Sequence, residues 1–444
     1  MGKINGVNSS KIGVIRATSL VAGNMIGSGV FLLPATLALY GGISILGWIF
    51  SALGALVLAK VFSNLSILMP SVGGPYAYSR KGLGDFAGFL VAWGYWVSLW
   101  IGNAAITVAF ISYLTVFIPE LATNNLLAIV AGIISIWFFT WINTRGVKEA
   151  STIQLVLTIL KITPLALIAI FGIFFINWDN FFPFNISGES NFSAITATAT
   201  LTLWAFLGLE SATIPADNII NPTKNIPRAT LYGTLITTLV YVLGSMTIIG
   251  MIPSQELQVS NAPFADAAAI LWGESARYWM AGVACLAVFG VLNGWILLQG
   301  QIPLAISRDK LFPAIFAREN KKGAPVWGIV ISSVLITVVM MMNYTKGLVN
   351  TFKFLILIGT ITVLIPYLFS AVAYSIMVIE KKFANKNQGS IAGKLILAFL
   401  AFSFSIWAIA GSGEKSVFWG FLLLLAGLPV YVWIKWKNLK DQDD

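Results

Sequence analysis

Long apolar runs separated by short polar segments dominate the pattern of hydrophobic and polar positions. A helix needs roughly 17 to 25 mostly apolar residues to cross the hydrocarbon core of a bilayer, and about twelve runs meet that requirement. The predicted spans lie near residues 12–38, 43–69, 85–118, 124–143, 152–176, 193–216, 226–251, 276–305, 325–342, 349–379, 393–411 and 415–434. The pattern therefore predicts an all-α integral membrane protein with about twelve transmembrane helices.

Composition supports this prediction and argues against several classes of function. Of the 444 residues, 58% are apolar and 10% are charged, whereas soluble proteins carry about 25% charged residues. The single cysteine, Cys285, forms no internal disulfide, and the lack of histidine removes His-based metal sites and acid-base pairs. The short loops carry no motif for phosphate binding, metal ligation or nucleophilic catalysis. We therefore expect neither an enzyme nor a cofactor.

Basic residues determine the predicted orientation in the membrane. The formal net charge is +10, and most Lys and Arg residues fall in loops on one side of the predicted bundle. The opposite loops hold only Arg277, Lys346 and Lys415. Twelve spans put both termini on one side, and the positive-inside rule predicts that this side is cytoplasmic. We expect a multi-pass protein of the cell inner membrane. The charge thus indicates topology rather than nucleic-acid binding, and contacts with anionic membrane lipid are a secondary interpretation.

A glycine-rich stretch interrupts the first predicted span at Gly23-Asn24-Met25-Ile26-Gly27-Ser28-Gly29. A helix broken there would expose backbone polar groups in the membrane, which is tolerated where they line a cavity. The alternative is close helix packing, because Gly23 and Gly27 form a GxxxG pair. Taken alone, the stretch is compatible with either interpretation.

A second glycine interruption, Gly208, falls in the sixth predicted span. The second interruption comes five spans after the first, and because five is odd the two blocks have opposite orientations, which favours inverted repeats with a binding site where the broken helices meet. The predicted repeats are residues 12–176 and 193–379. Residues 393–434 would add two helices to this single transmembrane domain, residues 1–444.

Residues near the two interruptions could bind a charged organic molecule. A helix that begins near Ser28 would present free amides and the positive end of its dipole to a carboxylate. Trp204 lies one turn before Gly208, and Trp295 lies mid-span beside a glycine. A desolvated cation stacked on such rings gains about 2 kcal/mol. Most other tryptophans are interpreted as interfacial or packing residues.

Two charged residues lie deep in predicted spans, Glu210 and Lys161. Because intramembrane acids are costly and commonly functional, Glu210 is predicted to be a gate or a proton carrier, with a structural role satisfied by local backbone as the alternative. Lys161 is a candidate to titrate during transport or to replace a structural cation. Asn103 could donate to a substrate, whereas Asn24 is more simply explained as a helix-fastening residue.

At these residues the chain resembles the amino acid/polyamine/organocation transporter superfamily over nearly its whole length. The motifs that carry the resemblance are Gly23 to Pro34, Gly73 to Tyr78, Trp100-Ile101-Gly102-Asn103, Leu203 to Ser211, Gly250 to Pro253 and Gly294-Trp295. Within the superfamily the chain is most similar to bacterial arginine/agmatine, lysine/cadaverine and ornithine/putrescine antiporters, especially the first. The resemblance implies a LeuT-like fold of five plus five inverted helices, in which helices 1 and 6 are broken.

The resemblance also implies a set of site residues and partners. The expected substrate-binding residues are Met25, Ser28, Gly29, Ser98, Leu99, Asn103, Trp204, Leu207, Trp295 and Gly359. The expected gating or proton-linked residues are Tyr95, Glu210, Tyr367 and Lys161. The partners implied are amino acid and amine substrates, a second copy of the chain, and a cytoplasmic amino acid decarboxylase linked through its product.

Three positions depart from the arginine/agmatine pattern. Leu99 and Gly359 replace small polar residues, which reduces hydrogen bonding to the substrate head. Lys161 instead resembles the proton-linked and heteromeric-type permeases of the superfamily, where a fifth-span lysine lies beside the first helix. Two hypotheses follow. One is an antiporter that exchanges arginine, lysine or ornithine for agmatine, cadaverine or putrescine, and the other is a proton-coupled or facilitative amino acid permease that uses Lys161.

Overall fold

The computed structural model describes residues 12–70, 73–145, 151–214, 216, 219–343, 347–384 and 391–443. Regular structure in these ranges is helical, apart from one isolated β-bridge between Ile12 and Ile219. Lys346, one of the three basic residues expected on the sparsely charged side, lies outside the described residues. The prediction of an all-α membrane protein is confirmed.

Most of the chain is in long helices joined by short connections. In the first half they are α1 (Val14–Met25), α2 (Ser28–Leu37), α3 (Ser44–Leu68), α4 (Gly74–Leu83), α5 (Asp85–Leu114), α6 (Glu120–Thr123), α7 (Asn125–Thr144), α8 (Ser151–Gly172) and α9 (Asn191–Leu203). In the second half they are α10 (Pro222–Met251), α11 (Ser254–Leu257), α12 (Pro263–Trp272), α13 (Glu274–Arg308), α14 (Val326–Asn343), α15 (Leu348–Ala384), α16 (Ala392–Gly411), α17 (Glu414–Leu425) and α18 (Gly427–Asp443).

Eleven segments of the described chain are long and apolar enough to cross a membrane. They match the predicted spans in order, except that the ninth corresponds to a shorter apolar helix, Val326–Met342 within α14. The last two predicted spans become α16 and the consecutive pair α17 and α18, which the segment Glu414–Lys440 covers. Each apolar run predicted from the sequence therefore contains a helix.

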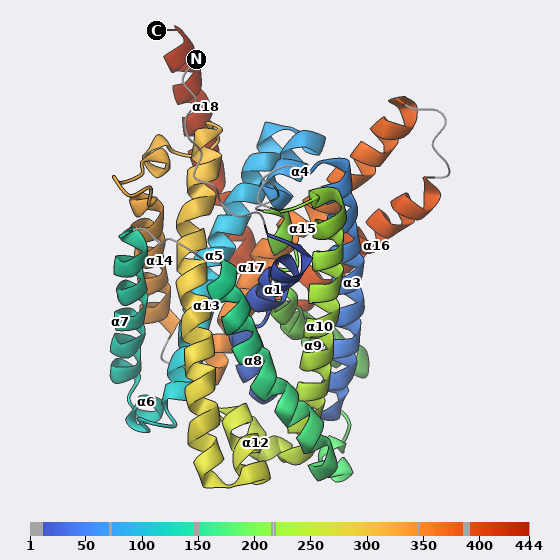
Figure 1. Ribbon diagram of the computed structural model, residues 1–444, viewed down its shortest axis with the longest axis vertical. Helices are drawn as coiled ribbons and strands as arrows, with labels where there is room; N and C mark the ends of the chain where they lie inside the picture. Colours follow the sequence, from blue (N-terminus) through green and yellow to red (C-terminus); the bar gives the residue numbers. More distant parts are fainter. Residues whose placement is uncertain are drawn as a thin grey trace.

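Helix α5 forms the centre of the bundle. In its most apolar window, 89% of the residues are buried, against 22% for α16 and for the α17–α18 segment. Helix α5 packs against α13 and α15, while α1 packs against α8 and α10. Figure 1 shows α7 and α14 at one edge of the bundle and α16 at the other. The helices around α5 therefore position any internal site.

The bundle has two distinct ends (Figure 1). Helix α4, the C-terminal end of α13 and α18 lie at one end, and α6 and α12 lie at the other. Arg80 and Lys81 in the last turn of α4 and Lys310 just after α13 are at the first end. Arg277, near the start of α13, is at the second. These placements agree with the grouping of basic residues used for the topology prediction.

Both predicted interruptions are real breaks in the helices. Helix α1 ends at Met25 and α2 begins at Ser28, with Gly27 in a non-helical conformation at φ −131° and ψ −142°. After α9, a short 3₁₀ turn precedes Gly208, whose φ of +100° is readily adopted only by glycine. A Cβ atom on Gly208 would lie 3.4 Å from the Cβ of Asn24. The two breaks therefore meet, and the packing-only interpretation of the first one is insufficient.

Candidate functional site

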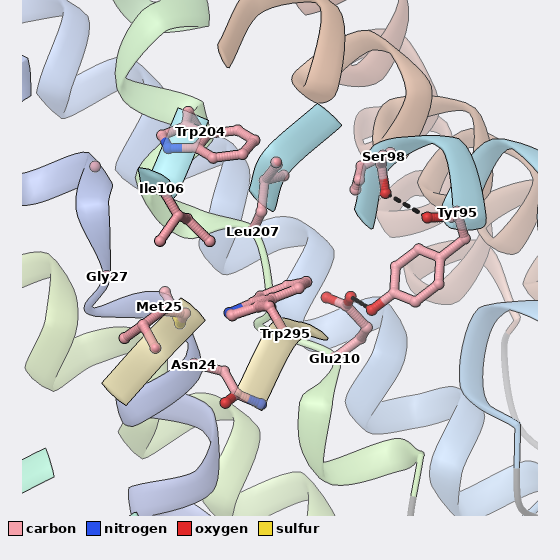
Figure 2. Close-up of a pocket in the computed structure, with 15 residues that line it drawn as sticks. Asn24, Met25, Gly27, Tyr95, Ser98, Ile106, Trp204, Leu207, Glu210 and Trp295 are labelled. Atoms are coloured by element: carbon pink, nitrogen blue, oxygen red, sulfur yellow. Dashed lines mark hydrogen bonds between the residues drawn. The ribbon is translucent and has the colours of Figure 1, made fainter. Parts of the chain in front are cut away.

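A cavity of about 40 Å³ lies where the two helix breaks meet, with room for about three water molecules. Figure 2 shows its lining around Trp295, with Met25 and Asn24 on one side and Glu210 on the other. Both breaks and the helices α5, α13 and α15 contribute to the lining. Its residues are Asn24, Met25, Gly27, Gly29, Tyr95, Ser98, Gly102, Ile106, Trp204, Leu207, Gly208, Glu210, Val291, Trp295 and Val363.

The first break directs two helix ends toward this cavity. Helix α2 starts there without a side-chain cap on Gly27, so its first amides retain the capacity to bind an anion. The C-terminal carbonyl groups of α1 carry the opposite partial charge. One of them is fixed, because the Tyr241 hydroxyl donates to the Met25 carbonyl at 2.6 Å. The break thus brings helix ends of opposite partial charge to the cavity.

The indole of Trp204 occupies a space that three glycines leave open. A Cβ atom would lie 3.0 Å from Trp204 Cδ1 if placed on Gly29, 3.0 Å from Cη2 if placed on Gly102, and 2.9 Å from Cζ3 if placed on Gly359. These glycines belong to α2, α5 and α15. Trp204 therefore lies inside the bundle and is not part of an interfacial aromatic belt. We call the three residues the glycine cradle.

Glu210 is held by two tyrosine hydroxyl groups. Tyr95 in α5 donates to Glu210 Oε1 at 2.7 Å, and Tyr367 in α15 donates to Oε2 at 2.5 Å. The glutamate is 1% exposed and lines the cavity, as Figure 2 shows for Glu210 and Tyr95. Because both carboxylate oxygens accept from neutral donors, the acid joins three separate segments at one point. This arrangement suits a gate that opens when either tyrosine moves away.

Some residues expected to bind substrate do not line the cavity. The side chain of Asn103 is fully buried and donates to Gln299 Oε1 at 2.7 Å, and Gln299 in turn donates to Ser333 at 3.0 Å. Leu99 is buried away from the cavity, and Gly359 reaches it only through its contact with Trp204. The side chain of Ser28 lies outside the part of the chain that the structure describes.

The cavity uses one face of α5, of which Tyr95 and Ser98 were predicted to be site residues and Gly102 and Ile106 were not. The four residues are spaced three or four apart and therefore lie on one side of the helix. The spacing was available in the sequence, but α5 is apolar on all sides and its inner face is not distinguished by polarity. Val291 and Val363 were missed for the same reason.

Lys161 lies behind the first break, not in the cavity. Its side chain is 2% exposed, and its Nζ donates to the carbonyl of Gly23 at 3.4 Å. One turn earlier on α8, Thr158 donates to the carbonyl of Ser19 at 3.2 Å. Two polar side chains of α8 therefore donate hydrogen bonds to backbone carbonyl groups of α1. No group of three or more potential metal-ligating acids or cysteines occurs among the described residues.

Comparisons with known proteins agree with this geometry. A family model described as amino acid permease matches residues 12–432. The cadaverine/lysine antiporter of Escherichia coli (strain K12) is 34% identical over 377 residues, covering 82% of this chain and 83% of the relative. A candidate arginine/ornithine antiporter of Bacillus subtilis (strain 168) is 32% identical over 467 residues, covering 98% and 99%. The putrescine transporter PotE of Haemophilus influenzae is 31% identical over 435 residues, covering 97% and 98%.

Proposed function

Because the chain belongs to the amino acid permease family of the amino acid/polyamine/organocation superfamily, we propose that it exchanges a cationic amino acid for the amine formed by its decarboxylation. The family consists of transporters, so the chain is a transporter and not an enzyme. The candidate amino acids are arginine, lysine and ornithine, and the corresponding amines are agmatine, cadaverine and putrescine. The names of the relatives include three of these amino acids and two of the amines.

The observation that carries the proposal is the cavity that joins two helix breaks to an aromatic wall and a buried carboxylate. In the proposed complex, the free amides of α2 receive the substrate carboxylate, and the carbonyl end of α1 receives the α-amine. Trp204 and Trp295 stack on the cationic side chain. Each oxygen of Glu210 already accepts a hydrogen bond from a tyrosine, which would weaken the attraction of this carboxylate for the more highly charged amine product.

Exchange requires the site to open to each side in turn. A cavity of about 40 Å³ is too small for an amino acid of arginine or lysine size, so loading requires Trp204 or its neighbours to move. We propose that residues 12–176 and 193–379 are inverted repeats whose relative motion alternates access. The outer gate would be Trp295, and the inner gate would be Glu210 with its two tyrosines.

Orientation and partners complete the proposal. The basic end of the bundle, which carries Arg80 and Lys310, would face the cytoplasm of a cell whose inner membrane holds the protein. Both termini would then be cytoplasmic. A cytoplasmic decarboxylase would supply the exported amine, and two copies of the chain would pair in the membrane.

Counterflow in liposomes tests the proposed exchange. Vesicles containing the purified protein and preloaded with agmatine, cadaverine or putrescine should take up labelled arginine, lysine or ornithine, with one matched pair giving the fastest uptake. A competition panel of unlabelled amino acids and amines then ranks the substrates. Uptake that is equally fast into empty vesicles would contradict strict exchange, and flux that does not saturate would indicate a pore.

The contact between Lys161 and Gly23 favours a second candidate, a proton-coupled or facilitative permease. A lysine that donates to the broken helix could couple its own protonation to movement of α1. In that case an imposed inward proton gradient should accelerate uptake into empty vesicles, and Lys161→Ala should abolish the acceleration while Lys60→Ala, a change in α3, leaves it intact. Transport by the wild type that is indifferent to the gradient would reject this candidate.

A further inference from the structure

A second, larger cavity lies outside the transport site, between α18 and the segment that follows α13. Its volume is about 490 Å³, and both basic and aromatic side chains line it. The Asn438 amide donates to the carbonyl of Lys310 at 2.8 Å, which joins the two sides of the cavity. In Figure 1 this region is at the end of the bundle that also holds α4. The volume is in the range of small-ligand sites, which is about 300 to 1,000 Å³.

The cavity carries an excess of positive charge. Lys310, Lys435 and Lys437 line it. Lys435 lies 3.4 Å from Asp85, but Asp85 also pairs with Arg80 at 2.9 Å. The ion-paired cluster and the two remaining lysines comprise four cations and two carboxylates: Arg80, Lys310, Lys435, Lys437, Asp85 and Asp309. Among the described side chains, Lys310 and Lys437 form no ion pair with an acid. The described residues that line the cavity thus include three lysines and no acid, which favours an anionic ligand.

The surroundings of the cavity place it at the border of the membrane. Helix α18 is the second half of the candidate span Glu414–Lys440, so its C-terminal turns leave the apolar layer. Trp433 and Trp436 are 47% and 60% exposed, and Leu439 is 62% exposed. Tryptophans next to lysines are typical of the boundary between lipid tails and headgroups. Lys437 also lies 5.8 Å from the ring centre of Trp433, so charge and apolar surface adjoin.

We propose that this cavity binds the headgroup of an anionic glycerophospholipid. Lys310 and Lys437 would hold the phosphate, Asn438 would border the glycerol, and the exposed faces of Trp433 and Leu439 would contact the start of the acyl chains. Basic pockets beside transmembrane helices at the membrane surface recognise such headgroups. The cavity also adjoins the centre of the bundle, because Phe312 in its wall packs edge-on against Trp96 of α5 at 5.6 Å.

Native mass spectrometry of the full-length, delipidated protein tests the proposal. The protein would be titrated with phosphatidylglycerol and, separately, with phosphatidylcholine that has the same acyl chains. The wild type should bind phosphatidylglycerol more tightly. The double substitution Lys310→Gln with Lys437→Gln should weaken that binding by about 30-fold, because each lysine near a charged membrane surface contributes about a fivefold gain. The conservative pair Lys310→Arg with Lys437→Arg should retain it.

A matched control removes two other lysines from the connection after α13. Lys321→Gln with Lys322→Gln deletes the same charge from exposed positions outside the cavity and should change the affinity less than twofold. Equal binding of the two lipids, or an equal loss in the control pair, would overturn the proposal. Glycerol 3-phosphate, which has no acyl chains, should bind more weakly than phosphatidylglycerol. Equally tight binding would also overturn the proposal, because the cavity would then be a site for a soluble phosphate ester.

Discussion

The glycine cradle makes Gly359→Ala the most informative single change. The new Cβ atom would lie 2.9 Å from Cζ3 and 3.6 Å from Cη2 of Trp204. Since carbon atoms pack at about 3.5 to 4.0 Å, the ring or α15 must move by roughly 0.6 to 1.1 Å. Forcing an extra methyl group into a packed interior costs about 1 to 3 kcal/mol. Trp204 also lines the cavity of about 40 Å³, so the ring should move into this space.

That displacement should appear as weaker substrate binding. We expect KM for counterflow to rise by about 5- to 150-fold in Gly359→Ala, the equivalent of the packing cost. The matched control is Gly294→Ala in α13, where an added Cβ atom would meet nothing within 4 Å. Both changes gain about 1 kcal/mol of helix propensity, so the control isolates the contact with Trp204.

A second change at Trp204 makes the test stricter. Phenylalanine lacks the outer ring atoms that approach Gly359, so Trp204→Phe combined with Gly359→Ala should be less impaired than the sum of the two single changes, by about 1 kcal/mol or more. KM and the melting temperature of the purified variants would be measured together. If Gly359→Ala changed neither quantity, or if Gly294→Ala raised KM equally, the assignment of Trp204 to the cradle would be refuted.

Three further changes test other parts of the site. Tyr367→Phe removes one donor from Glu210 at a cost of about 1 to 3 kcal/mol, and should slow exchange by about 5- to 150-fold without changing substrate affinity; normal turnover would contradict the gate. Gln299→Leu leaves Asn103 without its acceptor, so it should lower the melting temperature while KM stays within twofold. A changed KM with an unchanged melting temperature would indicate that Asn103 contacts the substrate. Trp295→Leu should raise KM for cationic substrates by about 2- to 30-fold through loss of a stacking face, whereas an unchanged KM would place Trp295 outside the bound complex.

The sequence was sufficient to predict the helical fold and the two helix breaks that line the candidate site. The long apolar runs leave few alternatives, because backbone polar groups in lipid must be satisfied within helices. The two breaks were predictable since Gly27 and Gly208 interrupt runs that would otherwise continue, and Glu210 stood out as a charge within apolar sequence. Such rare residues in a uniform background are the strongest signals in a membrane protein.

The orientation of side chains around α5 could not be predicted in the same way. Asn103 was expected in the site because amides bind polar substrates, yet its buried amide is needed by Gln299 on α13. Which partner a buried polar group takes depends on how two distant helices pack, and hydropathy carries no information on that. The resemblance implied a position for Lys161 beside the first helix, but its partner, the Gly23 carbonyl, depends on how α8 packs against α1.

The glycine cradle also bears on how tightly influx is coupled to efflux. Trp204 belongs to the second predicted repeat, while Gly29 and Gly102 belong to the first, so one ring packs between the two predicted repeats. If the carrier changed its orientation without substrate, Gly29 and Gly102 would have to move past the indole of Trp204. No contact with a ligand would then offset the free energy lost from this packing. A bound substrate would move the ring aside and supply that offset. The size of the Trp204 side chain would then determine how slowly the carrier changes its orientation without a bound substrate.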